Sequence, residues 1–555
     1  MSRTVSTPNG GTLSPISKVV CEYGTINTGD LVVMTEAGGV HAYTKDAPFP
    51  TYENNNTAGG KKLWSVGSAI VGRNSSYFRF DQQHQTIAKL SNGNFVQVVH
   101  GDDPNASSSY AINYGITNAA GSFVMPMTQV SGSSAVTIPT CGVYAFPSGG
   151  FAIVYAVAST IYMVVYDNNG TRTLADTAII TGYSAGTPNW QAVILSGGNL
   201  AIFYNNSAAS ALSFRRFNSS GVEQGTTLTV DNAAGWWYLF GAWETANGDV
   251  VTVYQDATSR TKISRVTAAG TLVGSPLNLG TTSSLWQSSM AKYCAVMNAD
   301  NTVTVLASDT SNTSYAGLYF VSATNTLTAS KTNANGLLTN ATFNSGSVGI
   351  AASATPNQIV IVGYQSTVYF GEYTSTGGTI TPYASFTGVS SPPNYVMSYA
   401  YNCGFMKVDA ISSSVLVVAS SGFDNSATTY NYNSILNVVS KTFNYTLFDG
   451  NGGTSESGIK DCTLSKDGTY MSAYNAGNSA YPSCYGQYLL RSGCYGVALS
   501  TFSKGSTGNV ATLGSFDLTT TQQDGPAVGF DSSAYPNVYG NKGSISSKSV
   551  NLKGI

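Results

Sequence analysis

The side chains that acid–base, nucleophilic or metal chemistry requires are few in this chain and widely separated. The three histidines are His41, His84 and His100, and the seven cysteines include no C-x-x-C pair of the kind that zinc sites use. The carboxylates are scattered along the chain, whereas glycosidase chemistry needs two of them facing each other. We therefore expect a protein that is not an enzyme, with no catalytic residues, no metal site and no cofactor.

Three short strings imitate catalytic motifs. Residues 182–186 (GYSAG) match G-x-S-x-G, but a nucleophile elbow needs a helix after the serine and a histidine later in the chain. Residues 453–460 (GTSESGIK) approach a phosphate loop with the lysine misplaced, and residues 465–468 (SKDG) hint at a single Asp-box turn with altered spacing. The first is interpreted as a chance match in a chain rich in Gly and Ser, the second as a loop, and the third as a lone copy that carries no glycosidase site. A sialidase-like glycosidase or a glycan depolymerase is the enzymatic alternative.

Two further groups of residues allow both a binding and a packing interpretation. Asp102 and Asp103 offer oxygen ligands to a cation, but a solvated turn is the favoured interpretation. Trp236, Trp237 and Trp243 fall close together in the sequence. We expect them to pack in the core or between repeats, with a stacking platform for sugar as the alternative.

Composition excludes several classes of partner. Charged residues make up 9% of the 555 residues and the formal net charge is −2, which argues against electrostatic binding of nucleic acid or of an anionic membrane. No apolar run is long enough to span a bilayer, and the first residues lack the apolar stretch of an export signal. With 42% hydrophobic residues, the chain can bury a large core.

The elements that must position any site are repeated. A turn followed by an alternating strand occurs as LSNGNFVQVV (90–99), FPSGGFAIVY (146–155), LSGGNLAIFY (195–204) and TANGDVVTVY (245–254). Weaker copies follow near residues 298, 355, 412 and 464, so that the unit recurs about every 54 residues. A second turn downstream in each unit, as in DNNG (167–170), gives four strands per unit.

Four antiparallel strands at this period are typical of a β-propeller blade. A twisted four-stranded sheet buries both faces only when it is stacked against neighbours, and the unit is too short for an independent sandwich domain. We therefore predict an all-β protein with an eight-bladed β-propeller of four-stranded blades over residues 80–515. Seven blades and an extra sheet are the main competitor.

The two ends lie outside the repeat. Residues 1–79 contain a hairpin-like pattern, and residues 516–555 finish with a strand-like segment. Because a closed ring juxtaposes its ends, we expect these segments to meet in one small β module that serves attachment. Cys484 and Cys494 flank a Tyr-rich loop, and for these two residues a disulfide and a pair of free thiols are both alternatives. The other cysteines are expected to be buried thiols.

Binding is predicted at the loops between the second and third strands of the blades. These b–c connections vary in length, whereas the turns between first and second strands are short and alike, and variable loops on a rigid scaffold commonly carry recognition. The longest belong to blades seven, eight and one. The predicted ligand-binding residues are Asp102, Asp103, Tyr110, Phe423, Tyr430, Tyr481, Tyr485, Tyr488 and Arg491, and the same loops hold Asp424, Tyr432 and Tyr495. The alternative is that these loops only cover blade edges or contact an adjacent subunit.

Two segments carry a resemblance to known families. GGFAIVYAVASTIYMVVYDNNGTR (149–172) resembles propeller repeats of large bacterial surface proteins and of phage virion proteins, and GDLVVMTEAGGVHAY (29–43) looks like the opening of bacteriophage tail and fibre proteins.

The resemblance implies a virion protein that is made in the bacterial cytoplasm and attaches to a host-surface glycan or protein. It also implies contacts with other virion proteins through the terminal segments, and a homo-oligomer in the particle. A purely structural or decorating virion protein is the alternative.

Overall fold

The computed structural model describes the chain in segments, densely between residues 84 and 383 and more sparsely elsewhere. The described residues are 5–6, 12–13, 16–21, 25–28, 30–34, 40–42, 62–65, 84–102, 110–117, 123–130, 140–184, 189–232, 238–256, 260–281, 294–308, 316–332, 348–352, 356–364, 368–377, 379–383, 406–412, 415–423, 429–437, 442–452, 458–464, 469–475, 484–489, 496–511, 513–517, 543–545 and 549–553. Every regular element among them is a β-strand, and none of these residues forms a helix that could cross a membrane.

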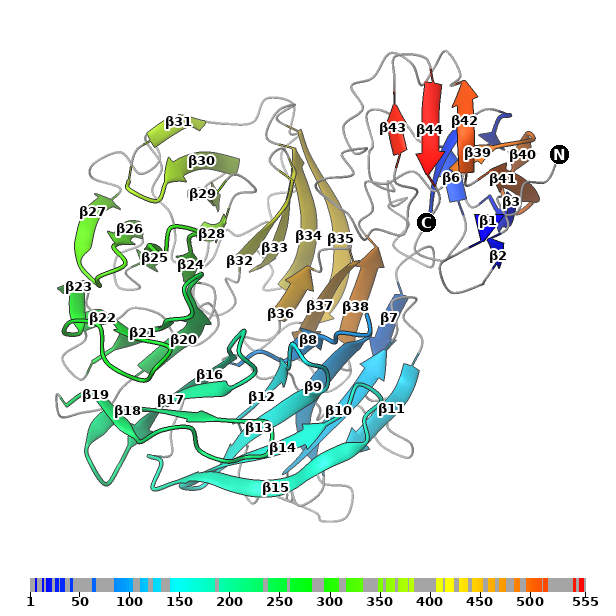
Figure 1. Cartoon of the computed structure of the whole chain (residues 1–555). Coiled ribbons are helices and arrows are strands. Elements are labelled where there is room, and N and C mark those ends of the chain that lie inside the picture. Colours follow the sequence, from blue (N-terminus) through cyan, green and yellow to red (C-terminus); the bar gives the residue numbers. More distant parts are fainter. Residues whose placement is uncertain are drawn as a thin grey trace. The chain divides into compact units, whose positions relative to one another are not determined.

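Eight four-stranded sheets dominate the described part of the chain, and the protein is an eight-bladed β-propeller, as predicted. The first seven sheets each use four strands that are consecutive in the sequence, and successive blades follow one another in the larger unit (Figure 1). Blades one to four are β8 (Ile87–Lys89), β9 (Phe95–Asp102), β10 (Tyr110–Thr117) and β11 (Phe123–Gln129); β12 (Thr140–Ala145), β13 (Phe151–Val157), β14 (Thr160–Tyr166) and β15 (Arg172–Thr181); β16 (Trp190–Ile194), β17 (Leu200–Asn206), β18 (Ala211–Phe217) and β19 (Leu228–Asp231); β20 (Tyr238–Glu244), β21 (Val250–Gln255), β22 (Arg260–Val266) and β23 (Leu277–Thr281).

Blades five to eight continue the pattern, with one exception in the last sheet. They are β24 (Ala295–Met297), β25 (Val303–Ser308), β26 (Ala316–Val321) and β27 (Leu327–Thr332); β28 (Val348–Ala352), β29 (Gln358–Tyr364), β30 (Val368–Thr374) and β31 (Thr379–Tyr383); β32 (Met406–Ser412), β33 (Val415–Phe423), β34 (Thr429–Asn437) and β35 (Thr442–Gly452); β36 (Gly458–Leu464), β37 (Thr469–Asn475), β38 (Cys484–Leu489) and β7 (Lys62–Ser65). The fourth strand of the eighth sheet thus comes from the N-terminal part of the chain.

The core lies between blades because side chains of a strand point alternately to its two faces. In β17, Leu200 and Ile202 join a buried cluster with residues of blade two, whereas Ala201 and Phe203 join another cluster with residues of blade four. Further clusters of this kind join blades one and two, four and five, and five and six. Among the described residues, the second strands β13, β17 and β21 are therefore buried on both faces, which explains their nearly continuous apolar sequences.

The predicted turns share one hairpin geometry. In blade one, Leu90 N donates to Asn94 O at 2.8 Å and Gly93 N donates to Leu90 O at 3.0 Å, and Gly93 has a φ of 87°. A left-handed residue in this position suits Gly or Asn. The turns between first and second strands place there Gly93, Gly149, Gly198, Gly248, Asn301 and Asn357, and the turns between third and fourth strands place there Gly170, Gly221, Gly270, Asn325 and Gly377.

The chain divides into two compact units. One comprises Trp64–Thr463 and Ser472–Tyr485, and the other comprises Met1–Leu63, Leu464–Met471 and Gly486–Ile555. The smaller unit holds a five-stranded sheet, a three-stranded sheet and two strand pairs, all within the described residues. Their strands are β1 (Val5–Ser6), β2 (Thr12–Leu13), β3 (Ile16–Val20), β4 (Thr25–Ile26), β5 (Leu31–Met34), β6 (Val40–Ala42), β39 (Gly496–Ala498), β40 (Phe502–Ser503), β41 (Thr507–Ala511), β42 (Leu513–Asp517), β43 (Gly543–Ile545) and β44 (Ser549–Lys553).

The smaller unit interleaves segments from distant parts of the sequence. The order of its five-stranded sheet is β3-β41-β39-β5-β6, and the predicted N-terminal hairpin is present as β5 paired with β6. Val19, Val32 and Phe502 contribute to its buried apolar cluster. Strands from residues 16–42 therefore pair with strands from residues 496–511, while the predicted division at residues 79 and 515 stays a prediction.

Candidate functional site

The turns between first and second strands, here called the a–b turns, are hydrogen-bonded from blade to blade. Asn247 N in blade four donates to Asn301 Oδ1 in blade five at 2.7 Å, and Asp300 N donates to Asn357 Oδ1 in blade six at 2.9 Å. Ser375 Oγ, in the turn between the third and fourth strands of blade six, donates to Asp300 Oδ2 of blade five at 2.6 Å. These three hydrogen bonds connect a–b turns to turns of the neighbouring blade, which agrees with the expectation of a structural face.

Two arginines reinforce this face from matching positions, the last but one residue of a third strand. Arg265 of β22 is fully buried and donates to Asn301 O at 2.6 Å and to Ala323 O at 2.9 Å, with its guanidinium 3.6 Å from Asp249 Oδ2. Burial lowers the pKa of Arg265, and Asp249 opposes that shift. Arg216 of β18 bonds to carbonyls of the third-to-fourth-strand turn in blade four. Both side chains fasten one blade to turns of the next.

Four of the predicted binding residues lie at strand ends beside b–c connections: Asp102, Tyr110, Phe423 and Tyr430. Asp102 pairs with Tyr110 across the mouth of the connection 103–109 in blade one. In blade seven, Phe423 pairs with Thr429 and Tyr430 pairs with Gly422 across the connection 424–428. The strand register therefore runs to the last residue before these two connections.

The remaining predicted residues fall on blade eight or outside the described residues. The prediction that Tyr485, Tyr488 and Tyr432 lie in loops is wrong: Tyr485 and Tyr488 belong to β38, the third strand of blade eight, and Tyr432 belongs to β34. Tyr488 lies near the end of β38 that is remote from the b–c connection. Outside the described residues lie Asp103, Asp424, Tyr481, Arg491 and Tyr495. The structure brings Asp102 and Tyr110 together through their backbones, and the grouping of the three loops stays a prediction.

A buried polar cluster lies on the b–c side of blades three and four. Asp231 ends β19, and its Oδ2 accepts hydrogen bonds from Tyr254 Oη and Lys262 Nζ, both at 2.9 Å. Lys262 Nζ also lies 3.1 Å from Asp256 Oδ2, and Asp256 Oδ1 accepts from Arg260 N across the connection 257–259. Burial opposes the charge on Lys262, yet these two carboxylates leave its pKa raised. This cluster was not predictable, because nothing in the local spacing of the sequence marks the four side chains as neighbours.

A second buried group lies at the starts of the first strands of three blades. The ring of His84 stacks on Trp190 with centroids 3.9 Å apart, and His84 Nε2 lies 3.1 Å from Trp190 O. Trp190 Nε1 donates to Thr140 Oγ1 at 2.8 Å. His84, Thr140 and Trp190 come from blades one, two and three, so this histidine packs between blades.

Other residues singled out by the sequence have structural surroundings where they are described. Trp243 packs against the apolar cluster between blades four and five, as expected, while Trp236 and Trp237 lie outside the described residues. Cys21, Cys141 and Cys294 are buried thiols, and burial raises the pKa of Cys294 to about 12. The described residues contain no group of three or more His, Cys, Asp or Glu that could hold a metal ion.

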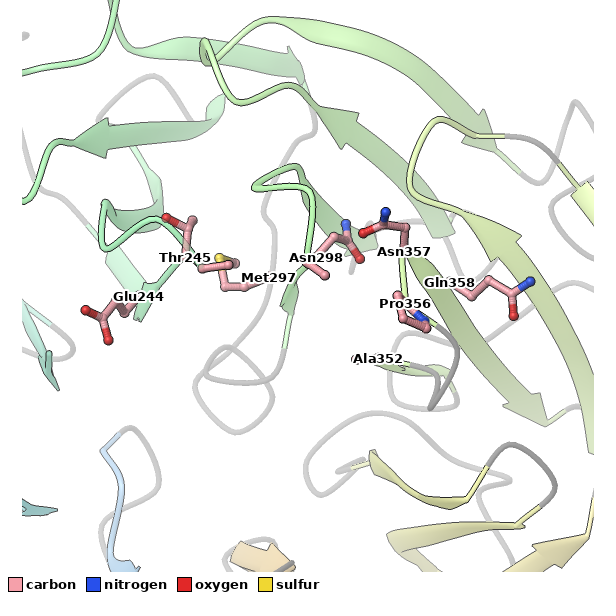
Figure 2. A pocket seen from close by; sticks show the side chains of 10 residues that line it. Glu244, Thr245, Met297, Asn298, Ala352, Pro356, Asn357 and Gln358 are labelled. Atoms are coloured by element: carbon pink, nitrogen blue, oxygen red, sulfur yellow. The ribbon is translucent and has the colours of Figure 1, made fainter. Parts of the chain in front are cut away.

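One pocket opens at the a–b turns of blades four, five and six, with a volume of ≈350 Å³. Figure 2 shows it between the ends of first strands, with the amides of Asn298 and Asn357 turned toward one another. Its lining consists of Glu244, Thr245, Ala246, Met297, Asn298, Ala299, Ala352, Pro356, Asn357 and Gln358. These turns were expected to be structural, and the pocket was not predicted from the sequence.

Comparison with known proteins gives likeness in solved structures only. No family model and no curated protein matches the sequence. The BP39L lectin from Burkholderia pseudomallei is similar at TM-score 0.40 and 14% identity, over 68% of this chain and 99% of the lectin. The Dos1 propeller is similar at TM-score 0.37 and 10% identity (74% and 95% covered), and a prolyl endopeptidase at 0.36 and 10% (82% and 64%). Similarity at this level does not indicate an activity. The assignment of the fold rests on the strand pairing within the eight sheets.

Proposed function

We propose that this chain is a non-enzymatic virion protein of a bacteriophage, associated with the tail or its fibres, that presents its propeller for attachment to the host. The recognition surface is the b–c face, formed by the connections of blades one, seven and eight. Its ligand is a glycan or protein of the host surface. The terminal segments hold the chain to other virion proteins, and several copies assemble in the particle.

The observation that supports this proposal is the contrast between a–b turns of one shared geometry and b–c connections of differing length. On the a–b side, Asn247, Asp300 and Ser375 bond to residues of neighbouring blades, so the turns serve the ring. On the b–c side, strand pairing ends at Asp102 and at Phe423, and the connections that follow these two residues differ in length. A rigid base with variable connections suits recognition, and Tyr side chains offer large contact area at low entropic cost.

The terminal segments suit attachment to a neighbour through exposed sheet edges. In the five-stranded sheet the outer strands are β3 and β6, and Val20 of β3 is 44% exposed. Unpaired edge strands add strands from partners by backbone hydrogen bonding. This supports placing the virion contact in the N-terminal segment.

Adsorption inhibition tests the proposal. Purified protein should compete with phage for host cells, and a joint Tyr110→Ala and Tyr430→Ala variant should compete at least about tenfold less well, as loss of interface anchors predicts. Val222→Ser, which changes a 57% exposed side chain on the opposite turns, is the matched control and should compete like the parent.

Three outcomes contradict parts of the proposal. If the parent protein does not compete at all, a purely structural or decorating role replaces attachment. Release of reducing sugar from host envelope by the purified protein would establish the depolymerase alternative. An equally effective folded Tyr110→Ala and Tyr430→Ala variant would place the receptor surface elsewhere.

A further inference from the structure

The pocket at blades four to six repeats one element of the propeller three times. Glu244, Met297 and Ala352 each end a first strand, and each is followed by an a–b turn that also lines the pocket. The three inner strand ends and turns therefore form its wall (Figure 2). A volume of ≈350 Å³ falls at the lower end of the range for small-molecule sites.

Some polar groups of the wall are already used. Glu244 accepts from Ser196 N at 2.7 Å and from Ser196 Oγ at 2.8 Å, so both carboxylate oxygens are engaged by blade three. Thr245 Oγ1 lies 2.6 Å from Asn247 Oδ1. The one carboxylate among the described lining residues therefore fixes a turn instead of facing a ligand as a lone charge.

Other polar groups of the wall have no partner among the described residues. Asn298 is 4% exposed and its Nδ2 donates to Thr302 Oγ1 and Thr304 Oγ1, which leaves Oδ1 as an acceptor. Asn357 Oδ1 accepts from Asp300 N, which leaves Nδ2 as a donor. The amide of Gln358 offers both kinds of group. One fixed acceptor, one fixed donor and one amide with both functions thus line the same cavity.

We propose that this pocket binds a neutral saccharide unit of one or two rings. Each sugar hydroxyl both donates and accepts, which matches the amides of Asn298, Asn357 and Gln358. The apolar wall of Met297 and Pro356 suits the C–H surface of a sugar ring. The site lies at the a–b turns, so it is independent of the proposed attachment surface on the b–c face.

The chemistry of the lining separates this class from others. An anionic ligand would lose its hydration and meet no cationic side chain among the described lining residues. An apolar ligand would strip water from the amides without replacing their hydrogen bonds. A neutral polyol brings no charge into the pocket, and its hydroxyl groups replace the hydrogen bonds that the amides make with water.

Saturation-transfer NMR and calorimetry on the full chain test the proposal. The probes are glucose, galactose, mannose, N-acetylglucosamine and their methyl glycosides, with N-acetylneuraminic acid as the charged comparison. Binding of at least one neutral probe at millimolar concentration is expected, and the charged sugar should bind more weakly. Gln358→Ala should weaken binding of that probe about tenfold, because it removes one hydrogen-bonding amide.

Two further variants make the test specific. Asn199 holds in blade three the turn position that Gln358 holds in blade six, and it lies outside the pocket, so Asn199→Ala should leave binding unchanged. Ala299→Trp fills the pocket from an exposed position and should abolish binding while the chain stays folded. Absence of binding by every neutral probe, or binding that survives Ala299→Trp in a folded chain, overturns the proposal.

Discussion

At the scale of single residues, Gly198 is the position where the cost of a left-handed backbone in an a–b turn can be measured without a steric clash. Its φ is 82°, and a Cβ added there would meet nothing within 4 Å, so any cost of a side chain comes from the backbone alone. Gly197→Ala is the matched control, because that site is equally open and its φ is not positive. We expect Gly198→Ala to lower the free energy of unfolding by about 1 kcal/mol.

Chemical denaturation of the two variants checks this expectation. Gly197→Ala should leave stability unchanged or raise it slightly, because Ala restricts the unfolded chain. Equal midpoints for the two variants would show that the turn tolerates a left-handed Ala, contrary to the proposed role of the repeated Gly and Asn residues.

Asp300 gives the same turns a dependence on pH. Burial favours its neutral form, but hydrogen bonds from Ser375 and Thr302 outweigh that effect and lower the pKa of Asp300. A carboxyl whose pKa is lower in the folded state stabilises the fold above its unfolded pKa, and this contribution is lost as pH falls through the folded pKa. Asp300→Ala should therefore cost about 1 kcal/mol at pH 7 and much less in acid.

Urea denaturation at pH 7 and near pH 3 measures both differences. The comparison of variant with parent at each pH removes the contribution of all other carboxyls. A cost that is the same at both pH values would mean that Asp300 acts through packing of the turn and not through its charge.

At the scale of elements, the third strands carry the links between blades. Arg265 in β22 is 0% exposed, donates to two carbonyls of blade five and lies beside Asp249. Its removal leaves both carbonyls without these hydrogen bonds, and leaves the buried Asp249 with the hydrogen bond from Asn247 Nδ2 but no cation. We expect Arg265→Ala to cost about 3–5 kcal/mol. Arg216→Ala, at the matching position of β18, should cost less than about 1 kcal/mol, because its bonds are exposed.

Thermal denaturation of Arg265→Ala and Arg216→Ala provides the measurement. Arg265→Met serves as a second variant, because it keeps apolar bulk and removes only the bonds. If Arg265→Ala and Arg216→Ala unfold at the same temperature, the buried arginine is not a link between blades.

The same elements show what the sequence could and could not predict. The turns were predictable because Gly or Asn recurs four residues after the first strands of blades one to five, as at Gly93 and Asn301. The partners of Arg265 were not, because a strand residue gives no local sign of which neighbouring blade it reaches. The pocket was missed for a related reason, since it forms only when three turns distant in sequence lie side by side.

At the scale of the whole molecule, the repeat predicts eight units but not which residues complete the eighth. Seven sheets take their fourth strand from the sequence that directly follows the third, and these turns have visible signals. The eighth sheet instead takes β7, a four-residue segment far upstream. Non-local pairing of so short a strand has no signature in periodicity, because the pattern reports only local turns and alternation.

This pairing predicts different stabilities for two truncated chains. A chain that begins at residue 62 keeps β7, whereas a chain that begins at residue 67 lacks it, and both lack the N-terminal strands of the smaller unit. Without β7, the strand β38 loses a partner in the sheet order and becomes an open edge. We expect the shorter chain to melt at least about 5 °C lower, and to associate more readily through that edge.

Differential scanning calorimetry with light scattering measures both effects. A synthetic peptide that spans residues 58–68 should restore part of the lost stability when it is added to the shorter chain. Equal melting temperatures for the two chains would mean that β7 adds no stability to the eighth blade, and that closure of the propeller depends on other contacts.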